Sequence, residues 1–160
     1  MLAIYFYDVV LSLHIAAIVI AFGVTFTYPV LIPYLMRRHP RTMPAIHEAQ
    51  ERVGKLVITP AATVALLAGA YLASDRDYWS EVWVTIPLLV LVGLLGLGGA
   101  FFTPQERKAA QLAARDVAAP ADGDVAWSAE YQAVSRRIAA VGALASALVL
   151  IALFFMTAKP

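Results

Sequence analysis

The sequence predicts an all-α fold: a polytopic membrane protein built as a four-transmembrane-helix bundle with short amphipathic cytoplasmic helices. Four apolar stretches, at about 7–35, 53–73, 83–102 and 138–156, are each long enough for a helix that crosses ~30 Å of hydrocarbon. The chain is 61% apolar and 14% charged, whereas soluble domains average roughly 45–50% and 25%. None of the four stretches has the polar face of period 3.6 that a soluble helix shows. We therefore expect a single transmembrane domain over residues 1–160.

Lysine and arginine are distributed unevenly among the connections between these stretches. The first and third connections, which lie on one side of the membrane, hold five each: Arg37, Arg38, Arg41, Arg52 and Lys55, then Arg107, Lys108, Arg115, Arg136 and Arg137. Arg76 and Lys159 lie on the other side. Because basic connections stay in the cytoplasm, the sequence predicts a multi-pass protein of the cytoplasmic (inner) membrane with both termini outside.

Proline residues interrupt the first two stretches. Pro29 and Pro33 predict a kink near the inner end of the first, and the helix should break at His39–Pro40. A new helix is expected from Thr42 as its N-cap, amphipathic at the inner surface and running straight into the second stretch. Pro60 predicts a further kink just inside the membrane.

The third and fourth stretches are rich in small residues, which let helix backbones approach closely in lipid. We expect tight packing at Gly93, Gly96, Gly98, Gly99 and Gly142.

The third connection should contain a helix of its own. Residues 103–106 read Thr-Pro-Gln-Glu, the pattern of a capping box, and Ser128 is the expected cap of the last helix. Asp122 and Asp124 resemble part of a calcium loop, but the remaining ligands of such a loop are missing, so we reject that site.

Most catalytic patterns are absent. Without cysteine the chain has no disulfide, thiolate metal site or iron–sulfur cluster, and it has no phosphate loop, zinc spacing or nucleophile elbow. The expected partners are the lipid bilayer and a second copy or a membrane complex, and not nucleic acid.

His14 is the one ionisable residue well inside an apolar stretch, which makes it the leading site candidate. A neutral imidazole there can bind haem iron through one nitrogen, or it can simply bond to a neighbouring helix through Tyr71, Thr63 or Ser146. His39 and His47 are weaker candidates at the cytoplasmic surface. His47 should lie on the order of 20 Å from His14, too far to share an iron.

Met156 is the methionine at comparable depth in the outer half, so it is a speculative second axial ligand. An ordinary interfacial apolar residue is the simpler interpretation.

Several short motifs follow one another along the chain: Leu13-His14-Ile15, the proline-bearing end of the first stretch, Glu51-Arg52, Ile58-Thr59-Pro60, and Arg136-Arg137. In these the chain resembles the CopD-like group of four-span bacterial membrane proteins, which includes the HemJ-type protoporphyrinogen oxidase. The resemblance implies that the membrane is the bacterial cytoplasmic membrane, that His14 is a haem ligand and that Arg52 is a basic group near a haem propionate. The HemJ type carries a histidine and a lysine in its third span, whereas residues 83–89 here contain neither, so the resemblance is closest to the branch without an assigned activity.

Two functions follow from these observations. The first is a membrane protein that binds haem b through His14 in a redox or tetrapyrrole-related role. The alternative is a cofactor-free accessory subunit that associates through the small-residue faces of the third and fourth stretches. A transporter ranks last, because the apolar stretches offer almost no polar lining.

Overall fold

The computed structural model describes residues 5–119 and 125–159, and every regular element in these ranges is helical. The elements in chain order are α1 (Phe6–Phe22), η1 (Gly23–Thr27), α2 (Tyr28–Arg38), η2 (Pro40–Thr42), α3 (Met43–Val53), η3 (Gly54–Ile58), α4 (Thr59–Asp75), α5 (Val82–Leu97), η4 (Gly98–Phe102), α6 (Thr103–Ala118) and α7 (Ala129–Ala158).

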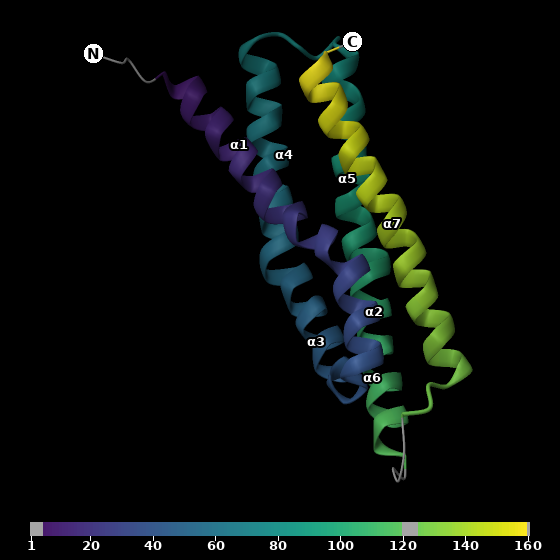
Figure 1. The fold of residues 1–160 in the computed structure, drawn as a ribbon. Helices are drawn as coiled ribbons and strands as arrows, with labels where there is room; N and C mark the ends of the chain where they lie inside the picture. Colours follow the sequence, from purple (N-terminus) through teal and green to yellow (C-terminus); the bar gives the residue numbers. More distant parts are fainter. Residues whose placement is uncertain (1–4, 120–124, 160) are drawn as a thin grey trace.

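Consecutive elements join into four rods, Phe6–Arg38, Pro40–Asp75, Val82–Ala118 and Ala129–Ala158, each long and apolar enough to cross a membrane. This confirms the predicted four-helix membrane bundle. The start of α1 and the end of α7 lie at the same end of the bundle as the α4–α5 connection (Figure 1), which we call the terminal end. The α2–α3 turn and the start of α7 lie at the opposite end, which we call the basic end.

The first rod bends before its prolines. Pro29 has no N–H, and its ring excludes the carbonyl of Thr25 four residues earlier, so the chain adopts the 3₁₀ turn η1 there. Threonine side chains bond to backbone carbonyls three residues earlier: Thr25 Oγ1 donates to Phe22 O and Thr27 Oγ1 to Val24 O, both at 2.7 Å. The kink is therefore confirmed, one turn earlier than Pro29. The break at His39 is also confirmed.

Two wide π-helical turns, η3 and η4, occur in the second and third rods, and each is followed directly by Thr-Pro. A proline at position i cannot bond to the carbonyl at i−4, and a π turn is one way to accommodate it. At η4, Thr103 Oγ1 donates to Gly98 O at 3.0 Å. The helix continues through Thr103, so the predicted capping box is wrong: the Glu106 carboxylate turns to another helix instead.

The helices change partners along the bundle. Towards the terminal end α1 packs on α4, and α5 packs on α7; towards the basic end α3 packs on α6. The first core is built mostly from alanine, with Ala17 and Ala21 of α1 against Ala62 and Ala65 of α4. Small side chains there let the two backbones approach closely.

The glycines of the third and fourth rods behave differently from the prediction. A Cβ built at Gly93, Gly96, Gly98, Gly99 or Gly142 meets nothing within 4 Å in the described part of the chain. The expected tight packing at these positions is therefore wrong for the single chain. Alanines of α1 and α4 make the close contact instead.

A second core lies at the basic end, where α3, α6 and the first turns of α7 meet. Met43 and Tyr131 are fully buried there, against Ala109, Ala113 and Val134. Ser128 caps α7 as predicted, since its side chain accepts from Tyr131 N at 3.2 Å. The Asp122–Asp124 segment lies outside the described residues.

Candidate functional site

His14 faces α4 from the middle of α1. Its Nδ1 lies 2.8 Å from the backbone carbonyl of Ala65, and not against Tyr71, Thr63 or Ser146 as the simpler interpretation expected. A carbonyl can only accept, so Nδ1 carries the hydrogen. In the neutral imidazole Nε2 is then the nitrogen with a free lone pair.

Gly69, one helical turn beyond Ala65, makes room for this ring. A Cβ at Gly69 would lie 3.0 Å from His14 Cε1 and 3.3 Å from Nδ1, closer than ordinary contact. No other glycine in the described residues meets a neighbour within 4 Å. A lone glycine in α4 is an ordinary feature of a membrane helix, so nothing in the sequence pattern distinguishes Gly69 as the neighbour of His14.

The arrangement fits axial ligation of a haem iron. Histidine ligands of metals almost always donate their second N–H to a carbonyl or carboxylate, which fixes the tautomer and the ring direction. Across residues 5–119 and 125–159, Nε2 of His14 makes no hydrogen bond, and no cluster of three or more His, Asp or Glu side chains could hold a metal ion instead. Nε2 of His14 is therefore the atom of this site through which a metal could be bound.

The other two predicted haem contacts are not brought to His14. Met156 is half-buried on α7, and α4 stands between the outer parts of α1 and α7 (Figure 1). Arg52 precedes Ala65, the partner of His14, by 13 residues along one rod, about 20 Å. The geometry gives no support to these two assignments, and they stay predictions.

A second polar site lies in the core at the basic end. His47 is only 2% exposed, so its expected place at the surface is wrong. Its Nδ1 lies 2.6 Å from Glu106 Oε2 of α6, and its Nε2 lies 3.0 Å from the hydroxyl of Tyr131 on α7. We call these three residues the polar clamp, because they tie α3, α6 and α7 together.

The hydrogen bonds of the polar clamp run from Tyr131 to His47 and from His47 to Glu106. Burial, and then the negative charge of Glu106, raise the pKa of Tyr131 well above its ordinary value, so its hydroxyl stays protonated. Tyr131 can then donate to Nε2 while Nδ1–H donates to the carboxylate. Trp127 stacks on the Tyr131 ring at 4.4 Å between centroids and covers that side.

One pattern in the sequence could have revealed the polar clamp. His47 lies one turn after Met43 on the apolar face of an amphipathic helix, and Glu106 lies on the alanine-rich face of another. An ionisable residue on an apolar face needs a partner. Two such residues on neighbouring helices are therefore candidates to pair with each other.

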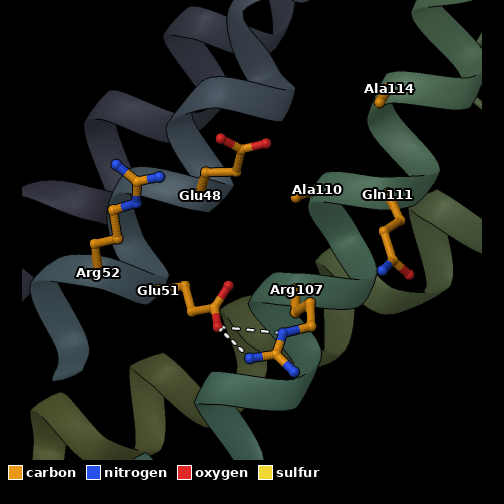
Figure 2. A pocket seen from close by; sticks show the side chains of 7 residues that line it. All are labelled: Glu48, Glu51, Arg52, Arg107, Ala110, Gln111 and Ala114. Carbon is orange, nitrogen blue, oxygen red and sulfur yellow. Dashed lines mark hydrogen bonds and ion pairs between the residues drawn. The ribbon is translucent and has the colours of Figure 1, made fainter.

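A cleft of about 410 Å³ opens beside the polar clamp, between α3 and α6 (Figure 2). Its lining residues are Glu48, Glu51, Arg52, Arg107, Ala110, Gln111 and Ala114. Across its base Glu51 Oε1 accepts from Arg107 Nη2 at 2.8 Å and from Lys55 Nζ at 2.6 Å. The hydrogen bonds from Lys55 and then Arg107 hold the pKa of Glu51 below its ordinary value.

Comparison with known proteins adds no family to this geometry: no family model, curated protein or solved structure matches the chain. The resemblance to the CopD-like group therefore stays a prediction.

Proposed function

We propose that this protein binds haem b in the membrane, with His14 as an axial ligand, and serves a redox or tetrapyrrole-related role. One observation carries the proposal: the Nδ1 of His14 is bonded to Ala65 O, which leaves Nε2 as the lone-pair nitrogen. The haem would supply one-electron redox chemistry.

The residues of this chain contribute binding and orientation. The Ala65 carbonyl fixes the tautomer of His14 and the direction of its ring. Gly69 provides the space in which the ring sits.

An absorption spectrum tests this proposal. Protein purified in detergent from a haem-replete host should show a Soret band, and His14→Ala should remove it. His39→Ala is the matched control, because His39 is an exposed histidine outside the apolar rods. A wild-type protein without the band, or a His14→Ala protein that keeps it, would refute the proposal.

We also propose that the basic end faces the cytoplasm of a bacterium and that both termini face outward. The ten basic residues at that end support this orientation. Because the chain has no cysteine, single-cysteine variants give clean labels. An impermeant maleimide added to whole cells should label Ser80→Cys, in the α4–α5 connection, and leave Thr42→Cys unlabelled; the reverse pattern would invert the topology.

A cofactor-free interaction subunit is the second candidate, and one observation favours it. The glycines of α5 and η4 lack neighbours within the described chain, so a second helix could approach there. Replacing Gly96 and Gly99 with leucine should then abolish a crosslinked oligomer in membranes. Crosslinking that persists in the double variant would exclude this interface.

A further inference from the structure

Two charged side chains of α3 line the cleft and form no ion pair with any residue that the structure describes. Glu48 and Arg52 are one helical turn apart and lie on the same wall, opposite Ala110 and Ala114 of α6 (Figure 2). In the part of the chain that the structure describes, neither forms a salt bridge within 4.0 Å; the cleft's other carboxylate, Glu51, is paired with Arg107 and Lys55. The cleft therefore presents one carboxylate and one guanidinium to a ligand.

The balance of charge selects the kind of ligand. The four charged residues that line the cleft are two acids and two arginines, so their formal charges cancel. A simple anion would gain from Arg52 but lose beside Glu48. A zwitterion with a phosphate and a primary ammonium would satisfy both, because guanidinium binds phosphate through paired N–H donors and a carboxylate accepts from an ammonium.

The position of the cleft matches the headgroup layer of a bilayer. Arg52 is immediately followed by the apolar stretch of the second rod, which begins at about residue 53. The alanine floor leaves room between the helices, and a space of about 410 Å³ lies within the range of small-molecule sites, roughly 300–1,000 Å³.

We propose that this cleft binds a phosphoethanolamine group, with the phosphate on Arg52 and the ammonium on Glu48. The boundary position favours an aminophospholipid as its source over a soluble phosphoethanolamine. Arg107 is a positioning residue: held by Glu51, it fixes the distance between α3 and α6 and thereby the width of the cleft.

Native mass spectrometry of the detergent-solubilised protein tests this site. Wild-type protein titrated with equimolar phosphatidylethanolamine and phosphatidylglycerol should retain the first preferentially. Arg52→Gln should lower its retention by about tenfold, the loss expected for one charge-assisted contact. Arg37→Gln is the matched control, an exposed arginine at the same end that does not line the cleft. Glu48→Gln should reduce the preference between the two lipids to about one.

The remaining outcomes show whether the ligand comes from the lipid or from solution, and whether the proposal is overturned. If soluble O-phosphoethanolamine displaces the lipid at equal concentration, the recognition chemistry holds and the ligand comes from solution. If wild type retains both lipids equally, or Arg52→Gln binds as wild type does, the proposal is overturned. Thermal unfolding of each variant identifies any loss that comes from misfolding.

Discussion

The Nδ1 of His47 lies 2.6 Å from Oε2 of Glu106, although 59 residues separate them in the chain and both are almost fully buried. This contact, together with the hydroxyl of Tyr131, holds three helices at the basic end. A buried acid is costly unless it is paired, so the contact specifies which faces of α3 and α6 meet.

Breaking this pair should destabilise the protein. His47→Ala or Glu106→Ala leaves a buried polar partner without its bond, and we expect a loss of about 3–5 kcal/mol in unfolding free energy for each. The double variant His47→Leu/Glu106→Leu should cost much less than the sum of the two. Denaturation in detergent measures all of these, and strictly additive losses would show that the two residues act independently.

Removing only the Tyr131 hydroxyl should have a smaller effect. Tyr131→Phe keeps the ring that stacks on Trp127 but leaves Nε2 of His47 without its donor, at a cost of about 1–3 kcal/mol. Tyr34→Phe is the control, since Tyr34 is 55% exposed. Equal thermal stability of Tyr131→Phe and Tyr34→Phe would contradict the clamp.

The close packing of His14 against Gly69 can be tested without haem. Gly69→Ala places a methyl group 3.0 Å from His14 Cε1 and should displace the ring, whereas Gly93→Ala enters open space. The second change should be neutral or stabilise the helix by up to about 1 kcal/mol. We expect Gly69→Ala to unfold at a lower temperature than Gly93→Ala; equal unfolding temperatures of the two variants would refute the close approach.

Acid should weaken the bridge between α3 and α6. Because the folded pKa of Glu51 is lowered, its carboxylate stabilises the fold fully above its ordinary pKa, and this contribution disappears as the pH falls through the lower folded value. Glu51→Gln should therefore be less stable than wild type near neutral pH, by up to about 1 kcal/mol for a pair this accessible. The two proteins should converge well below pH ~4; a difference that stays constant with pH would contradict the ion-pair origin.

The sequence was sufficient to predict the four apolar rods, the break at His39 and the cap at Ser128, because hydropathy, proline and capping are local properties. The apolar faces mark His47 and Glu106 as residues that need a partner, but they do not say which helix supplies it. Whether His47 faces solvent depends on which helix covers it, and that partner is about 60 residues away in the chain.

The failed predictions have the same cause. Glycine in a membrane helix allows a close neighbour but does not supply one, so Gly93, Gly96 and Gly99 face open space while Gly69 receives a histidine ring. Residues 103–106 matched a capping box in sequence, yet the helix continues from η4 through Thr103, and Glu106 pairs with the buried His47 instead.

The central claim is that Nε2 of His14 is the iron-binding atom of a haem site, and haemin titration of the solubilised apoprotein tests it most directly. We predict a Soret band that saturates at about one haem per chain in wild type and in His39→Ala, and no saturable band in His14→Ala. A His14→Ala protein that binds haemin with the wild-type stoichiometry and affinity would contradict it.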